Sequence, residues 1–326
     1  MPFSPEFLKN ASKELEVANI KGDFEIVAEC IKKAVAAIAK VNSNVNPKNV
    51  DIYIHGSYAN KTNIFFPSNL EVCVELKKTK AYVPSKIAVI DPEPKKLPED
   101  FVPQYRMYNN YFVKQALDFP PEVFRKLLFQ ALSEITGQKC TQNEKCIVVP
   151  AFGKLRHVVE ITPCFSFDYH EGGTAEADNG AVFKGVLLYD AGVHADIVTF
   201  PKLHAQNGHA KDLSSKGNFK KTVRLFKTLN AIYAREHETE PTRGYFVECL
   251  LFNVPDRLFV GTDNDVFLKV INYLSNCDMD NFACQNLVWH LFGTAGEFWM
   301  PSKARRFIQQ MSEQYKTFPE KRTLLA

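Results

Sequence analysis

The chain has 326 residues, of which 45% are hydrophobic and 24% are charged, and its formal net charge at pH 7 is +3. This composition is typical of one large or two ordinary globular domains and excludes a largely disordered chain. The small net charge argues against a nucleic-acid polymer as partner, and the lack of a long apolar run argues against a membrane-spanning helix.

The cysteines and the first residues of the chain indicate the cellular compartment of the protein. The eight cysteines lie in apolar segments such as Val72-Cys73-Val74, and no C-x-x-C pair occurs. The opening Met-Pro-Phe-Ser-Pro-Glu lacks the basic and apolar regions of a signal peptide. We therefore expect reduced thiols in a cytoplasmic protein, and no zinc site.

The first two thirds of the chain mix helical and strand patterns. An apolar stripe at spacings of three and four residues predicts a helix over residues 5–42, followed by a turn-rich stretch. Prolines make residues 79–104 an irregular excursion. Further helices are expected over residues 105–117 and 121–137. Strands are expected over residues 50–55, 70–76, 146–149 and 156–162, the last closed by Pro163, with a hairpin over residues 182–189 and 194–200.

The last third of the chain is almost wholly helical in pattern. Helices are expected over residues 218–236, 244–253, 264–276, 281–293 and 301–316. We expect an α+β fold with two lobes and a cleft between them. Residues 1–200 would form a mixed sheet with flanking helices, and residues 201–326 a helical lobe.

Polar residues follow a Gly-Ser turn at a fixed distance. Gly56 and Ser57 follow one predicted strand, and Asn69 and Glu71 lie two apart on the next, so they share a face. A glycine lets the backbone approach a phosphate, a hydroxyl and N–H groups bind it, and side chains of the next strand hold cations. A Gly-Ser pair alone is usually only a turn; the spacing to Glu71 favours a triphosphate site.

Glu160 and three cations extend this constellation. Glu160 stands among apolar residues of a predicted strand, where it either binds a cation or faces water. Lys220, Arg224 and Lys227 are spaced four and three apart on one helical face, which suits a triphosphate or a solvated surface.

Two residues further along complete the candidate set. Tyr245 is placed either to stack on a base or to fill the core. Glu248 lies among apolar residues and needs a partner, for which Arg224 is a candidate. The histidines predict no metal cluster: His204 and His209 are expected on a loop, and His55 beside the turn.

Five segments together resemble the bacterial cGAS/DncV-like nucleotidyltransferases (CD-NTases), across nearly the whole chain. They are residues 56–64, 68–76, 159–165, 201–208 and 248–255, with the sequences GSYANKTNI, SNLEVCVEL, VEITPCF, PKLHAQNG and ECLLFNVP. The resemblance implies a polymerase-β-like nucleotidyltransferase core and an α-helical lobe. It also implies synthesis of cyclic di- or trinucleotide second messengers from nucleoside triphosphates in anti-phage (CBASS-type) defence.

The resemblance further implies roles for single residues. Gly56 and Ser57 would hold the donor triphosphate. Glu71 and Glu160 fall where the family's second and third metal-binding acids lie, and Asn69 where the first lies, with Mg²⁺ or Mn²⁺ as the cofactor.

The implied nucleotide contacts lie in the helical half. Lys227 matches the helical lysine that meets the triphosphate, with Lys220 and Arg224 on the same face. Tyr245 matches the base-stacking tyrosine, and Gly244 stands where a phosphate-binding serine is common.

Asn69 departs from the family pattern and leaves alternatives open. An amide in place of the first acid removes a negative charge beside both cations, which lowers the rate by roughly 10³-fold or more. The residue is either a natural departure or an Asp→Asn change made to trap substrate. The alternatives to a cyclic nucleotide synthase are a catalytically impaired pseudo-enzyme that binds nucleotides as a sensor or scaffold, and a template-independent nucleotidyltransferase acting on RNA ends. Expected partners are an effector protein or a ubiquitin-like ligase that joins the tail at residues 321–326 to other proteins.

Overall fold

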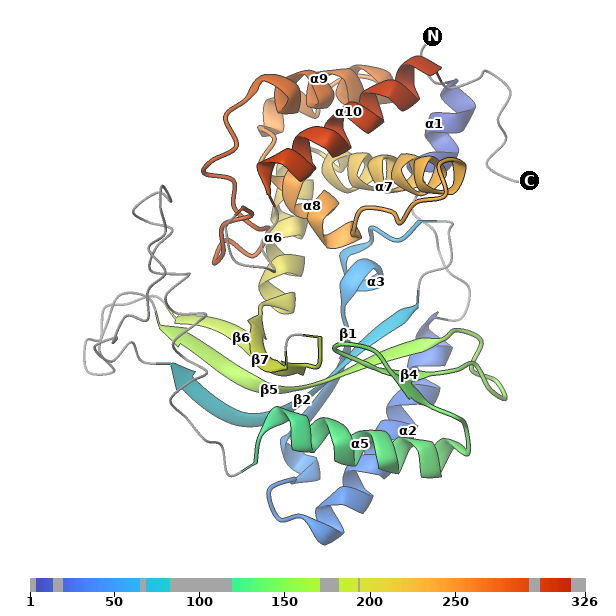
Figure 1. Cartoon of the computed structure of the whole chain (residues 1–326), viewed down its shortest axis with the longest axis vertical. Coiled ribbons are helices and arrows are strands. Elements are labelled where there is room, and N and C mark those ends of the chain that lie inside the picture. The colour runs from blue at the N-terminus through green and yellow to red at the C-terminus, as the bar shows by residue number, and fades with distance from the viewer. Residues whose placement is uncertain are drawn as a thin grey trace.

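The computed structural model describes residues 4–13, 20–64, 69–82, 119–170, 182–192, 194–292 and 300–317. A curved sheet with helices on one face forms one part, and a helical part lies over the other face, joined to it by α6 (Figure 1). The helix predicted over residues 105–117 lies outside the described residues, as does most of the proline-rich excursion. None of the helices in the described ranges is long and apolar enough to cross a membrane.

The described elements begin with an N-terminal helix and alternate strands and helices before the helical part. In chain order they are α1 (Pro5–Ala11), α2 (Ile20–Val41), η1 (Pro47–Asn49), β1 (Val50–Ile54), α3 (Gly56–Asn60), β2 (Leu70–Tyr82), α5 (Pro121–Thr136), β3 (Thr141–Gln142), β4 (Ile147–Val149), β5 (Val159–His170), β6 (Val182–Asp190), β7 (Ala195–Thr199), α6 (Pro201–Ser214), α7 (Asn218–Glu236), α8 (Gly244–Phe252), η2 (Asp256–Leu258), α9 (Asp263–Asn276) and α10 (Pro301–Thr317).

The sheet is mixed, with β5 at its centre. The strand order is β1-β2-β5-β4-β3, with β6 also pairing with β5 and β7 pairing with β6. β2 and β5 run parallel, and the other pairs are antiparallel. This arrangement aligns the start of β2 with the start of β5, which brings the polar residues of both strands to one place.

Pro163 does not end β5, contrary to the prediction that a proline closes the strand. β4 pairs with β5 as far as Ile161, and β6 pairs with β5 from Phe165 onward. Pro163 therefore lies in an interval along one edge of β5 with which neither β4 nor β6 pairs. Because no strand faces that edge there, the missing N–H of the proline costs no ladder hydrogen bond. The sequence shows the proline but not this interval.

The sheet has one apolar face and one polar face near the start of β2. Leu70, Val72 and Val74 are fully buried in a cluster with side chains of α2 and α5, the two helices that cover this face (Figure 1). Because strand side chains alternate, Glu71 and Cys73 point to the opposite face, beneath the helical part. The apolar layer thus fixes which face presents the candidate site.

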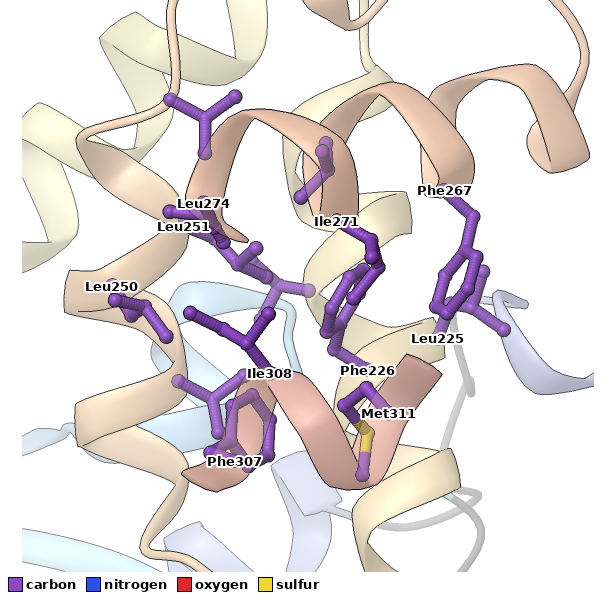
Figure 2. Close-up of a cluster of buried hydrophobic side chains, with 14 of the residues drawn as sticks. Leu225, Phe226, Leu250, Leu251, Phe267, Ile271, Leu274, Phe307, Ile308 and Met311 are labelled. Carbon is purple, nitrogen blue, oxygen red and sulfur yellow. The ribbon is translucent and has the colours of Figure 1, made fainter. Parts of the chain in front are cut away.

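A second apolar cluster holds the helical part together. Figure 2 shows side chains of α7, α8, α9 and α10 in mutual contact, among them Phe226, Phe267 and Phe307. Phe7 and Leu8 of α1 belong to the same cluster. The single helix predicted over residues 5–42 is therefore wrong, because α1 ends at Ala11 within the helical cluster and α2 packs on the sheet.

The predicted helices in the last third are mostly confirmed, with one error at residues 281–293. The described part of that segment forms turns and an isolated bridge between Ala283 and His290. The Asn286 side chain accepts the backbone N–H groups of Val288 and Trp289, and Leu287 has a φ of 59°. An asparagine that captures nearby backbone donors competes with helix formation, which explains the error.

The segment around His204 and His209 is a helix and not the predicted loop. α6 begins with Pro201 at its first position, where a proline fits a helix without loss of a hydrogen bond. His204 is buried within it. The loop prediction failed because α6 links the two parts and so lacks a clean apolar stripe.

Candidate active site

Glu71 and Glu160 lie side by side at the centre of the polar face. They are direct register partners on the parallel strands β2 and β5. Cα partners on adjacent strands point to the same face, so the two carboxylates are neighbours. The two acids that the resemblance assigns to one metal site therefore lie together. Glu160 is half-buried, so it can both face water and bind a cation.

Gly56 and Ser57, predicted as a turn and called the Gly-Ser turn here, are the first residues of the short helix α3 and lie directly over Glu71. The Ser57 backbone N–H donates to Glu71 Oε2 at 3.3 Å. Gly56 has a φ of +66°, and a Cβ at this position would lie 1.6 Å from Glu71 Oε2. Glycine is therefore required both for the backbone conformation and for the close approach of the carboxylate.

The Asn69 amide contacts Glu160 across the two strands. Asn69 Nδ2 donates to Glu160 Oε1 at 2.9 Å, and Asn143 Nδ2 lies 3.5 Å from the same oxygen. Asn143 was missed by the sequence analysis, because it lies on the turn before β4 and shares no motif with the acids. Two amides thus hold the orientation of one carboxylate.

The donor chemistry of this cluster fits a hard divalent cation. Glu71, Glu160 and Asn69 offer carboxylate and amide oxygens, the ligands that Mg²⁺ and Mn²⁺ prefer. Among the described residues no group of three or more His, Cys, Asp or Glu side chains is arranged to hold a metal. The fit is therefore that of two acids and one amide, with one negative charge fewer than three acids provide.

Burial and mutual repulsion shape the electrostatics of the pair. Burial raises the pKa of Glu71, and the nearby charge of Glu160 raises it further, against the opposing effects of His55 and the Ser57 N–H. Burial lowers the pKa of His55, but Cys73 and the two carboxylates outweigh this and raise it to about 9. Both shifts favour the protonated forms, which lowers the net negative charge that Glu71 and Glu160 would otherwise place side by side.

The three cations of α7 are buried rather than solvated. Lys220, Arg224 and Lys227 are 6%, 7% and 8% exposed, which contradicts the solvated-surface alternative. Arg224 donates to the backbone oxygens of Ser12 and Lys61, at 2.7 and 2.6 Å. The suggested partnership of Arg224 with Glu248 is therefore wrong, because Arg224 is committed to these carbonyls.

Glu248 forms a buried hub between the two parts of the molecule. Its carboxylate accepts hydrogen bonds from Asn60 Nδ2 at 3.0 Å and Thr62 Oγ1 at 2.6 Å, both just after the Gly-Ser turn. It also accepts from His204 Nε2 at 2.7 Å and from the Lys227 ammonium. Burial opposes ionisation, but the charge of Lys227 and the bond to His204 hold the pKa of Glu248 below its usual range.

Tyr245 presents an aromatic ring at the start of α8. It is 42% exposed, whereas the adjacent Phe246 is fully buried, so the core reading of Tyr245 is wrong. Its ring stacks on His204 with centroids 4.8 Å apart, and its hydroxyl accepts from Asn286 Nδ2 at 3.3 Å. No role was assigned to His204 and Asn286 from the sequence. Two signals pointed to His204: it lies in the family-like segment at residues 201–208, and Glu248 required a buried partner.

The comparisons with known proteins agree with this architecture. The family model described as the cGAS/DncV-like nucleotidyltransferase C-terminal helical domain matches residues 206–316. The Cyclic UMP-AMP synthase of Rhodothermus marinus is 30% identical over 81% of this chain and 83% of the relative. The Cyclic nucleotide synthase CdnE01 of Staphylococcus haemolyticus is 26% identical over 93% of this chain and 97% of the relative.

A solved structure covers both parts of the molecule. The structure of Rhodothermus marinus CdnE c-UMP-AMP synthase with Apcpp and Upnpp matches with a TM-score of 0.72 and 26% identity, over 99% of each chain. A mixed sheet with paired acids beneath a Gly-Ser turn, covered by a helical lobe, defines a nucleotidyltransferase class of fold. The chain belongs to the cGAS/DncV-like nucleotidyltransferase (CD-NTase) family.

Proposed function

We propose that this chain is a cyclic nucleotide synthase, which joins two or three nucleoside triphosphates into a cyclic di- or trinucleotide and releases pyrophosphate. The observation that carries the proposal is the register pairing of Glu71 with Glu160 directly below the Gly56-Ser57 turn. The names of the relatives support it, since they are cyclic nucleotide synthases, one of them solved with Apcpp and Upnpp.

We propose Mg²⁺ or Mn²⁺ as the cofactor, held by Glu71 and Glu160 with a weaker contribution from Asn69. When bound, the cation supplies positive charge to the phosphates and to the leaving pyrophosphate. The neutral amide of Asn69 makes this a weaker cation site than three carboxylates would form.

In this proposal the residues of the chain bind the donor triphosphate, orient its base and deprotonate the acceptor hydroxyl. The Gly56-Ser57 turn would receive the donor triphosphate, and Tyr245 would stack on a base. The buried cations Arg224 and Lys227 of α7 would act indirectly, because they hold the segment after this turn through the Lys61 carbonyl and Thr62. The acceptor hydroxyl oxygen forms a bond to the α-phosphorus while the bond from that phosphorus to the pyrophosphate oxygen breaks. The hydroxyl proton passes to the Glu160 carboxylate, which Asn69 and Asn143 hold in place.

A pseudo-enzyme is the second candidate, and one observation favours it. Asn69 uses its amide to donate to Glu160 Oε1, the oxygen that an acceptor hydroxyl or a cation would need. A protein of this kind binds nucleotides without turnover. Its role would be that of a sensor or scaffold.

The test compares the protein with an Asn69→Asp variant, each incubated with all four NTPs and Mg²⁺ or Mn²⁺. We expect pyrophosphate release that Asn69→Asp increases by roughly 10³-fold or more and Glu71→Gln abolishes. If neither protein releases pyrophosphate but NTPs raise the melting temperature, the pseudo-enzyme is correct. Incorporation of labelled NTP into RNA ends would instead identify a template-independent RNA nucleotidyltransferase.

We place the proposed activity in anti-phage defence of the CBASS type, where the product would act on an effector protein. Joining of the chain to other proteins by a ubiquitin-like ligase is a separate proposal. It concerns the tail at residues 321–326, which lies outside the described residues. A mass shift of this chain on co-expression with such a ligase would support it, and an unshifted mass would contradict it.

A further inference from the structure

The ring of Tyr245 rests on a buried histidine. The His204 and Tyr245 rings are inclined by only 24°, with centroids 4.8 Å apart. His204 is 4% exposed, whereas Tyr245 is 42% exposed. One ring is therefore part of the interior, and the other retains free surface on which a flat ligand can stack.

One buried hydrogen bond orients the His204 ring, and a second bond holds its backbone. Its Nε2 donates to Glu248 Oε2 at 2.7 Å, and its backbone oxygen accepts from Gln285 Nε2 at 2.7 Å. Burial lowers the pKa of His204, but Cys249 and Glu248 outweigh this and raise it to about 9, which favours a protonated ring at neutral pH. The Nδ1 atom of this buried ring has no hydrogen-bond partner among the described residues. Rotating this ring would break a buried charge-assisted hydrogen bond.

The same carboxylate reaches the Gly-Ser turn. Glu248 also accepts from Asn60 and Thr62, which directly follow that turn. Tyr245 and Glu248 are three residues apart on α8 and so lie on neighbouring positions of one face. The aromatic surface and the turn are thus connected through one buried hub that includes His204.

We propose that His204 is a positioning residue for the nucleotide: it holds the Tyr245 ring in the plane that stacks on the base and, through Glu248, fixes that ring relative to the Gly56-Ser57 turn. This inference rests on the proposed function, because it requires a triphosphate at the turn and a base at Tyr245. A histidine with a purely structural role would stabilise the fold without acting on base recognition.

Two substitutions separate the ring from the hydrogen bond. His204→Gln keeps a donor for Glu248 but removes the stacked ring, and His204→Phe keeps a ring but removes the donor. His237→Gln is a matched control, because His237 stacks on Tyr233 at 3.9 Å on the exposed end of α7. Dissociation constants for NTPs and for inorganic tripolyphosphate are measured with Mg²⁺ by calorimetry, alongside melting temperatures.

We expect His204→Gln to weaken NTP binding about tenfold and to leave tripolyphosphate binding unchanged, because tripolyphosphate has no base to stack. His204→Phe should recover only part of the NTP affinity, because it restores the stacked ring but not the bond to Glu248, and His237→Gln should match the wild type. In a Tyr245→Leu background, His204→Gln should change NTP affinity less than about twofold, because the two rings act as a unit.

The outcomes distinguish this inference from the proposed function. If the wild type binds NTPs and His204→Gln binds them equally well, or loses NTP and tripolyphosphate affinity alike, the positioning role is wrong and the proposed function stands. If His204→Gln does not fold, a loss of NTP affinity in His204→Phe as large as that in Tyr245→Leu overturns the inference. A wild type that binds no NTP would overturn the proposed function and the inference together.

Discussion

The Asn69 amide donates to Glu160 Oε1 at 2.9 Å, and it thereby links the starts of β2 and β5. A carboxylate at position 69, as in a site with three acids, would repel Glu160 and require a cation between the two side chains. The amide instead satisfies the carboxylate with a hydrogen bond. The consequence is a site whose order depends less on bound metal.

The first prediction concerns the metal response of Asn69→Asp. The new carboxylate loses the hydrogen bond and repels Glu160, so we expect a lower melting temperature without Mg²⁺ and a larger Mg²⁺-induced rise than in the wild type. Differential scanning fluorimetry over a Mg²⁺ series measures both. Asn276→Asp adds the same charge on α9 and should respond as the wild type does; an equal Mg²⁺ response in both variants would contradict the account.

The second prediction concerns Gly56→Ala. The added Cβ would overlap Glu71 Oε2 and would also force a φ of +66° on alanine. We expect loss of nucleotide binding and a lower free energy of unfolding, by about 2 kcal/mol or more. Gly137→Ala separates the two causes, because Gly137 has a φ of +63° but nothing within 4 Å of its added Cβ. Equal destabilisation with retained binding in both variants would show that the overlap with Glu71 is unimportant.

The third prediction concerns Glu248→Gln at the hub. The neutral amide leaves the charges of Lys227 and His204 buried and without their counter-ion, so we expect a loss of about 3 kcal/mol in unfolding free energy. Urea denaturation followed by fluorescence measures this loss. Asp256→Asn breaks a more exposed ion pair with Lys211 and should cost less than about 1 kcal/mol. If Asp256→Asn lost as much unfolding free energy as Glu248→Gln, the Glu248 hub would stabilise the protein no more than an exposed ion pair, and the account would be contradicted.

The fourth prediction concerns the pH dependence of stability. The pKa of His204 is raised from 6.5 to about 9, so its contribution to stability is fully present below pH 6.5 and is lost as the pH rises through 9. The groups that face it are Glu248 and Cys249 of α8 and the stacked ring of Tyr245, and Glu248 is shared with Lys227 of α7.

The difference in unfolding free energy between wild type and His204→Gln should therefore shrink between pH 6.5 and pH 9. Denaturant titrations at several pH values give this difference directly. His237→Gln should show no such trend. A difference that stays constant across this window would mean that His204 is neutral in the folded protein.

The local sequence pattern was enough to predict the strands and several of the helices, and to single out the acids as candidates. Gly137 takes the left-handed conformation that ends α5, as expected for a glycine at the end of the helix predicted over residues 121–137. Period-two alternation predicted that Asn69 and Glu71 share a face, and the family resemblance assigned Glu160 to the same site. The pairing of Glu71 with Glu160 depends on the parallel register of β2 and β5, which no local pattern gives.

The errors arose where tertiary contacts override local pattern. Residues 281–292 have the apolar content of a helix, but the Asn286 side chain takes up the backbone donors of Val288 and Trp289. The hub around Glu248 could not be predicted, because its partners come from α3, α6 and α7, which are far apart in sequence. No spacing rule connects them.

Product analysis tests the central claim most directly. The wild type and Asn69→Asp are incubated with labelled NTPs and Mg²⁺, treated with phosphatase and analysed by mass spectrometry. We predict a phosphatase-resistant product with the mass of two or three nucleotide units joined without free phosphate, formed faster by Asn69→Asp and not formed by Glu160→Gln. Absence of such a product from both active-site forms, or its undiminished formation by Glu160→Gln, would contradict the account.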